Sequence, residues 1–442
     1  MPANHHRFPR SSVDGGFSWW WWRRKFSKRE WTIVAAAAAF SILLVILSPV
    51  SVSRAFTNTS ANSGTASVWV PFTPSSKAQK NSACNDLPLS VYLFHGGGIL
   101  SGFVLVFVFV LIQCRIIAVC LDGSLPGYHI RRGFGSGSDS WLLHVEGGGW
   151  CSTYSSCSAR RRTKLGSSTY MEHEVEFLGI LSHDPLQNPV FCTSPMLYAH
   201  MFSNIQITLS VAYHDFFNWN KVKIRYCDGS SFSSHPDNEF GNGTKIFFRG
   251  QIIWDTVMDE LLSIGMSKAR EALLTGCSAG GLATLIHCDD FRSLLPRDTN
   301  VKCLADAGFF LNEKDIAGNR TIDSFYHDVV HLQGVAKSLN HDCITRSEPH
   351  KVHFVVCYRN SLLKTLTEFQ QNPEMGVFIN SCFVHCQTWA AETWHSPTSP
   401  RINNKTVAES VGDWYFKRAA AKQIDCPYPC NPTCYNMDLN RG

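Results

Sequence analysis

The stretch LTGCSAGGLA, residues 274–283, restricts the chain to a few folds. A short apolar run, EALLTG, leads into it, and LATLIHCDDFRSLL at 282–295 has the apolar spacing of a helix. Gly276 and Gly280 stand two residues before and two residues after Ser278. A strand that turns sharply into a helix leaves room only for small residues at those two places. The pattern therefore predicts a strand, a tight turn at Ser278 and a helix.

Such a turn has a chemical consequence for Ser278. It lifts the hydroxyl above the sheet and places it at the N-terminus of the next helix, where the helix dipole stabilises developing negative charge. The pattern G-x-S-x-G between a strand and a helix is typical of a hydrolase nucleophile. The alternative is a serine- and glycine-rich loop that only packs. Because the flanking strand and helix favour the first interpretation, Ser278 is our candidate nucleophile.

The rest of the chain predicts the sheet to which this turn belongs. From about residue 120 onward, strand-like runs alternate with helical ones. Residues 140–149 form a β-type run that ends in glycines, 221–230 alternate with period two, and 375–382 have the composition of a buried strand. Residues 250–266 place apolar side chains at helical spacing. We expect an α/β fold, with a mostly parallel sheet and helices on both faces.

Acyl transfer also needs backbone donors for the oxyanion, and two glycine triplets compete for this role. FHGGG at 94–98 opens a long apolar run, whereas HVEGGGW at 144–150 ends a convincing strand. We therefore choose the N–H groups of Gly149 and Trp150, with that of Ala279 as the third donor. The alternative for the second triplet is an ordinary glycine-rich β-turn.

The base should be a histidine late in the chain, on a loop that follows a strand. His385 in VFINSCFVHCQTW meets this description, His395 is second, and His287 is expected to be structural. Cys382 and Cys386 bracket His385 and would suit zinc, but disulfide bonds fit an oxidising compartment better. We therefore expect no metal and no organic cofactor.

Cysteines and glycosylation sequons indicate that compartment. The chain has 17 cysteines. N-x-[ST] sequons begin at Asn58, Asn242, Asn319 and Asn404. Both features are typical of the secretory pathway. The formal charge of +5 is too small to indicate a nucleic-acid partner.

The N-terminal part predicts a membrane attachment. Residues 1–30 are basic and are expected in the cytoplasm, and the apolar residues 31–52 are long enough for a single-pass signal-anchor or a signal peptide. Residues 53–118 are expected to form a stalk plus an anomalous apolar insertion, and most of the second apolar run, 99–121, lies within this range. Residues 119–442 are expected to form the catalytic domain, on the luminal or extracellular side.

Several segments resemble plant pectin acetylesterases, the group related to the animal carboxylesterase Notum. They lie within 119–434 and include GFGSGSDSWLLHVEGGGWC, TGCSAGGLATLIHCDDFRSLLP, VFINSCFVHCQTW and VGDWYFKRAAAKQIDCPYPCNPTC. The resemblance implies an α/β-hydrolase fold and a Ser-Asp-His triad that removes acetyl groups from pectin in the plant cell wall. It makes Ser278 the nucleophile and His385 the base, with the three backbone donors named above.

The family's acid lies in a segment similar to NAAYDSWQ that this chain lacks. LQGVAKSLNHDC at 332–343 leads to VFINSC without it, and residues 190–214 read as an insertion. The triad acid is therefore unknown. Asp306 in CLADAG is a weak candidate that we expect to be structural, followed by Asp342 and Glu374. Two alternatives stay open, a catalytically inactive pectin-binding homologue and a deacylase of a lipid-modified protein.

Overall fold

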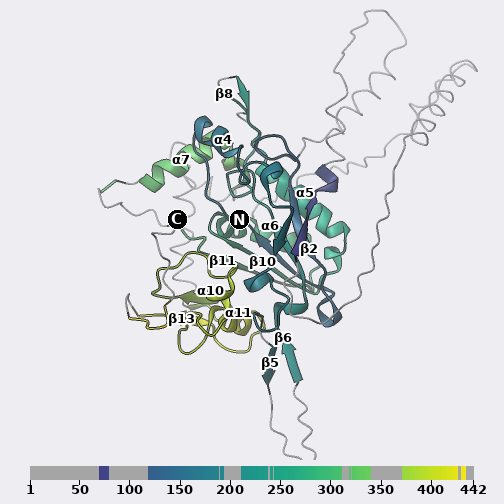
Figure 1. Cartoon of the computed structure of the whole chain (residues 1–442), viewed down its shortest axis with the longest axis vertical. Helices are drawn as coiled ribbons and strands as arrows, with labels where there is room; N and C mark the ends of the chain where they lie inside the picture. The colour runs from purple at the N-terminus through teal and green to yellow at the C-terminus, as the bar shows by residue number, and fades with distance from the viewer. Residues whose placement is uncertain are drawn as a thin grey trace, which may run out of the picture. The chain divides into compact units, whose positions relative to one another are not determined.

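The fold is built on one sheet of seven strands. The computed structural model describes residues 69–78, 118–188, 190–193, 211–236, 239–241, 243–310, 318–319, 321–339, 371–426 and 430–434 (Figure 1). The strand order is β11-β10-β3-β7-β2-β1-β4. In this order the strands are Asn300–Asp306, Glu271–Cys277, Ser140–Val145, Asn220–Ile224, Gly127–Arg131, Trp69–Pro74 and Glu174–Glu176.

The four strands from β11 to β7 run parallel to one another, and the other three extend the sheet by antiparallel pairing. Strand β1 therefore points the same way as β7, and the sheet is mostly parallel, as expected. In register, Gly276 of β10 lies between Val145 of β3 and Ala305 of β11. The carboxyl ends of these three strands thus meet at one edge of the sheet, where ligand sites of parallel sheets lie.

Helices cover both faces of the sheet. Leu143 packs into one core with helix α5 (Gly250–Ser263) and helix α6 (Ala279–Leu294). Its neighbour Leu142 points to the opposite face and packs with α10 (Ala391–Trp394) and α11 (Val407–Tyr415). Successive strand residues point to opposite faces, so a β3 run that is buried throughout requires cover on both sides. The predicted helices at 250–266 and 282–295 are confirmed as α5 and α6.

Further helices and small sheets surround this layer structure. Helix α4 covers Tyr154–Arg160 and α7 covers Thr321–Gln333. Three two-stranded sheets complete the described structure. They pair β5 (Val190–Thr193) with β6 (Val211–His214), β8 (Phe240–Gly241) with β9 (Thr244–Lys245), and β12 (Val377–Ile379) with β13 (Lys422–Ile424).

The prediction of a buried strand at 375–382 is wrong in its burial. Strand β12 is only three residues long, pairs with β13 outside the large sheet, and leaves Ile379 49% exposed. The run VFIN is apolar enough for a core strand, but the large sheet ends at β11 on this side. Strand β12 therefore does not pair with an edge of the large sheet, and it pairs with β13 instead.

Residues 69–78 fall within the expected stalk, yet the structure places them in the folded unit. Strand β1 lies between β2 and β4, and the Ser75 hydroxyl donates to Glu260 Oε2 at 2.7 Å. Residues 31–52 lie outside the described residues, as do 99–117 of the second apolar run. Among the helices that the structure describes, none has both the length and the apolar character of a membrane span.

Disulfide bonds join distant parts of this fold, as the cysteine content predicts. Six of them connect described residues: Cys120–Cys227, Cys151–Cys157, Cys277–Cys386, Cys288–Cys303, Cys382–Cys434 and Cys426–Cys430. Cys382–Cys434 joins the C-terminal segment to the residues that follow β12, and Cys426–Cys430 closes a short loop within that segment. One of the six, Cys277–Cys386, involves the residue that directly precedes Ser278.

Candidate active site

Ser278 lies at the sharp turn between β10 and α6, as the sequence predicts. Its backbone has φ 57° and ψ −122°, a conformation that L-residues other than glycine rarely adopt. Holding a residue in such a region costs of order 1–3 kcal/mol, and strain of this kind clusters at functional sites. The Ser278 N–H donates to the Asp306 carbonyl at 2.9 Å, which fixes the turn to the end of β11. The side chain is half-buried.

The two flanking glycines allow the chain to pass this closely. A Cβ at Gly276 would lie 2.2 Å from the Gly280 carbonyl oxygen. A Cβ at Gly280 would lie 2.1 Å from the carbonyl oxygen of Val145 in β3. Both distances are far shorter than any contact a methyl group can make. The G-x-S-x-G pattern is therefore a packing requirement of the turn against β3 and α6.

The glycine triplet after β3 crosses directly over this turn. A Cβ at Gly147 would lie 2.3 Å from the Cys277 carbonyl oxygen and 3.1 Å from Ser278 Cβ. Gly149 has φ +67° and open space where a side chain would stand. Of the two candidate triplets, the one at 147–149 thus lies beside Ser278, and the one at 96–98 lies outside the described residues.

The three proposed donors have free backbone N–H groups. Among the described residues, no acceptor pairs with the N–H of Gly149, Trp150 or Ala279. Trp150 is held through its ring, because its indole Nε1 donates to Ser231 Oγ at 2.7 Å. Ala279 is the first residue of α6, so its N–H has no partner within the helix. These groups are available to an anionic oxygen.

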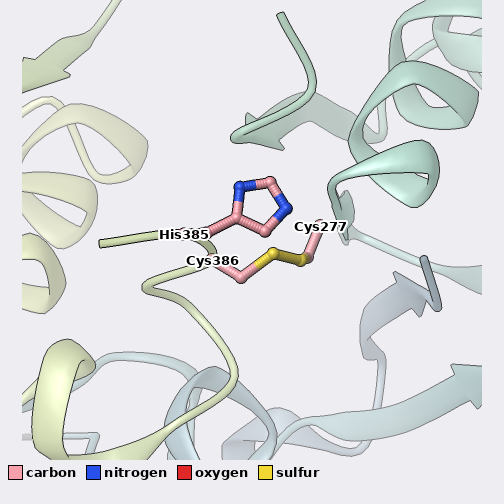
Figure 2. A group of neighbouring side chains, drawn as sticks. All are labelled: Cys277, His385 and Cys386. Atoms are coloured by element: carbon pink, nitrogen blue, oxygen red, sulfur yellow. A yellow bond between two sulfur atoms is a disulfide. The ribbon is translucent and has the colours of Figure 1, made fainter. Parts of the chain in front are cut away.

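A disulfide bond connects the segment that carries His385 to the Ser278 turn. Cys277, which precedes the serine, is bonded to Cys386, which follows the histidine. Figure 2 shows the His385 imidazole beside this bond, and a ring nitrogen and the two sulfur atoms lie within 4.8 Å of one another. The imidazole is exposed. Because both sulfurs are in the disulfide, they cannot act as thiolate ligands, and the group is not arranged as a zinc site.

Asp306 at the end of β11 holds the segment that carries His385. Its Oδ2 accepts three hydrogen bonds, from Gln387 N at 2.7 Å, Thr388 N at 2.8 Å and Thr388 Oγ1 at 2.8 Å. Burial raises the pKa of this carboxyl above its ordinary value, while the Thr388 and Gln387 donors and the His385 charge act in the opposite direction. Asp306 is therefore a buried carboxyl that contacts the residues directly after the histidine.

The other candidates of the sequence have different partners. His287 is buried and stacks on Trp254, with the two ring centroids 4.3 Å apart. This packing agrees with the structural role that we expect for it. His395 closes α10 and contacts Thr406 Oγ1 through Nδ1 at 3.0 Å. Glu374 is exposed and pairs with a lysine of the loop after α11. Asp342 lies outside the described residues.

Sequence reasoning missed the covalent link between the two halves of the site. The signal was present, because Cys277 directly precedes the candidate nucleophile and Cys386 directly follows the candidate base. Two half-cystines adjoining two residues that must meet form a plausible pair. The roles of Thr388 and of the side chains that contact the glycine loop, residues 147–149, had no comparable signal in the sequence. Each of them is an ordinary polar residue in its local sequence.

The mostly parallel sheet, its helices on both faces and the serine turn after β10 define an α/β-hydrolase-like protein. The pectinacetylesterase family model matches residues 104–204, 198–357 and 344–435. The chain belongs to this family. The matched segments change near the residues that we interpret as an insertion and near the interval that lacks the family's acid.

Individual relatives agree with the family. Pectin acetylesterase 5 from Arabidopsis thaliana is 51% identical over 378 residues, which cover 73% of this chain and 83% of that protein. Pectin acetylesterase 4 from the same plant is 49% identical over 373 residues, covering 72% and 85%. The palmitoleoyl-protein carboxylesterase NOTUM of Mus musculus is 32% identical over 211 residues, which are 46% of this chain but 36% of that protein.

Proposed function

We propose that this protein is a carboxylic ester hydrolase that removes acetyl groups from pectin, with Ser278 as the nucleophile. The observation that carries the proposal is the strained Ser278 turn at the N-terminus of α6, with a glycine loop across it and three free N–H donors. The choice of acetylated pectin follows the names of the high-coverage relatives. The relative that acts on a palmitoleoyl-protein matches over a much smaller share, which disfavours a lipid-modified substrate.

The reaction proceeds in two steps, acylation and deacylation of Ser278. The Ser278 Oγ attacks the acetyl carbonyl carbon while a ring nitrogen of His385 takes the hydroxyl proton. The carbonyl oxygen becomes an oxyanion, which the N–H groups of Gly149, Trp150 and Ala279 stabilise. The intermediate collapses, the bond to the sugar oxygen breaks, and His385 returns the proton to that oxygen. Water then attacks the acetyl-serine with His385 as base, and acetate and free Ser278 are formed.

The histidine needs an orienting group, which an acid provides in a triad. Here the segment 385–388 is held at two points, by the disulfide to Cys277 and by three hydrogen bonds to Asp306. Both anchors act on the three residues that directly follow His385, and they restrict the backbone that carries the imidazole. We propose that they keep His385 at Ser278 in place of the missing family segment, which argues against a catalytically inactive homologue.

The location is part of the proposal. Disulfide bonds persist in oxidising compartments, so we place the described domain in the secretory pathway or the cell wall. The expected signal-anchor at 31–52 stays a prediction. Endoglycosidase treatment of the expressed chain would test the luminal side, since sequons at Asn319 and Asn404 lie among the described residues. Unchanged gel mobility would contradict this placement.

Acetate release from acetylated pectin tests the chemistry. Ser278→Ala should lower the release by about 10⁴-fold or more, because it removes the attacking atom. Ser293→Ala is the matched control, since it removes an exposed hydroxyl from the far end of the same helix, α6. A fluorophosphonate probe should label the wild type and Ser293→Ala but not Ser278→Ala. Unchanged acetate release by Ser278→Ala would overturn the assignment.

A further inference from the structure

The carbonyl oxygens of the glycine loop are held by two side chains from outside the loop. Arg160 Nη2 donates to the Gly148 carbonyl at 2.9 Å and to the Gly149 carbonyl at 3.2 Å. The Tyr226 hydroxyl donates to the Gly149 carbonyl at 2.8 Å. Arg160 is itself fixed, because its Nε donates to the Leu165 carbonyl at 3.0 Å and its guanidinium lies 5.1 Å from the Tyr226 ring centre.

A held carbonyl also sets the direction of the next N–H. A peptide unit is planar and trans, so its C=O and its N–H point in opposite directions. The Gly148 carbonyl shares its peptide plane with the Gly149 N–H, and the Gly149 carbonyl shares its plane with the Trp150 N–H. When Arg160 and Tyr226 bind these oxygens, they direct both N–H groups away from themselves, and the loop lies over the serine turn.

We propose that Arg160 and Tyr226 are positioning residues of the oxyanion site, which fix the Gly149 and Trp150 donors before substrate arrives. The inference rests on the proposed function, since it assigns a task within that reaction. Without these two contacts, glycine peptides would reorient readily, because glycine has wide conformational freedom. Donors that are fixed in advance stabilise the transition state without reorganisation at the moment of reaction.

The same tyrosine connects the loop to the third donor. Tyr226 Oη accepts from the Ser231 N–H at 3.0 Å. The Ser231 hydroxyl in turn donates to the Ala279 carbonyl at 2.7 Å and accepts from Trp150 Nε1 at 2.7 Å. Tyr226 and Ser231 are both buried, so these bonds are protected from competing water. One network of hydrogen bonds thus joins all three residues that supply oxyanion donors.

Two variants with a matched control test the positioning role. Tyr226→Phe should lower kcat about 10- to 100-fold, less than or comparable to the loss of a whole donor, because the Gly149 peptide loses its fixed orientation. KM for a p-nitrophenyl acetate substrate should stay within about twofold of wild type, as expected when only transition-state stabilisation is lost. Arg160→Gln should act in the same direction, and Arg160→Lys should recover part of kcat.

Tyr415→Phe is the control for loss of a buried tyrosine hydroxyl. Tyr415 is buried on α11, and its hydroxyl donates to Glu271 Oε2 at 2.9 Å on the opposite face of the sheet. We expect it to lower the melting temperature as Tyr226→Phe does, with kcat unchanged. A boronic acid that forms a tetrahedral serine adduct should bind Tyr226→Phe more weakly by the same factor as kcat falls, a change that a purely structural role would not produce.

The outcomes separate this inference from the proposed function. Full activity of Ser278→Ala would overturn the proposed function, and the positioning role with it. Loss of activity in Ser278→Ala together with wild-type kcat in both Tyr226→Phe and Arg160→Gln would overturn only the positioning role. If Tyr226→Phe does not fold, Arg160→Gln decides, because Arg160 is half-buried at the end of a short helix. If Arg160→Gln binds the boronic acid with the same affinity as the wild type, this result would also reject the inference.

Discussion

Removal of the disulfide between Cys277 and Cys386 should cost both stability and activity. The bond closes a loop of 109 residues. In the chain-entropy account, opening a loop of this length destabilises the fold by about 4.7 kcal/mol. Natural domains are stable by about 5–15 kcal/mol in total, so the double variant Cys277→Ala/Cys386→Ala should keep its fold with a small margin. The double alanine leaves no single thiol to form new pairs.

The effect on catalysis should exceed the effect on folding. Cys386 adjoins His385 and Cys277 adjoins Ser278, so the bond sets the distance between the two backbone segments that carry the reacting groups. Displacement of a catalytic group by about 1 Å can cost about 10²-fold in rate. We expect kcat for acetate release to fall by about that factor. The assay is done without urea, so that the variant is folded.

The bond between Cys288 and Cys303 supplies the matched control. It joins α6 to β11 across a separation of 15 residues, for which the same account gives about 3 kcal/mol. Urea unfolding should therefore rank the two double-alanine variants about 1.7 kcal/mol apart. Activity should stay near wild type in the control. Equal stability losses would refute the entropy reasoning, and an unchanged kcat in the Cys277/Cys386 variant would refute the positioning of His385 by this bond.

Two further predictions concern packing and pH. Gly280→Ala should destabilise the fold by about 3 kcal/mol, because its Cβ would lie 2.1 Å from a β3 carbonyl oxygen, whereas Gly149→Ala, with open space at φ +67°, should cost about 1–2 kcal/mol in urea unfolding. Burial acts to raise the pKa of Glu172, but hydrogen bonds from Lys164 and Arg225 outweigh it and lower the pKa from 4.5 to about 2. This stabilisation is present above pH 4.5 and is lost as pH falls toward 2, so the stability deficit of Arg225→Met should shrink over that range. A deficit independent of pH would contradict the assignment.

Local sequence was sufficient for the central unit of the fold and its serine. The turn at Ser278 is encoded within ten residues, because the apolar run, the two glycines and the helical spacing act on one another directly. The same holds for β3 with its terminal glycines and for α5. Helices and strands of this kind follow from periodicity and from the few residues that fit a tight turn.

Position in the large sheet was beyond such reasoning. The run at β12 has the composition of a buried strand, and β1 lies in a segment of stalk-like composition, yet the first is half-exposed and the second pairs with β2 and β4. Composition states whether a segment could be buried. Which edge is free to pair with it depends on the path of the whole chain.

The parts that complete the candidate site come from the tertiary structure alone. Asp306 holds the His385 segment across 81 residues, and Tyr226 reaches the Gly149 carbonyl across 77. Contacts at such separations leave no periodic pattern, because any polar residue at the right place in space can make them. The sequence thus determined the candidate nucleophile and its turn, which are local. Tertiary packing decided what orients the histidine and what holds the oxyanion loop, because these groups become neighbours only when the sheet assembles.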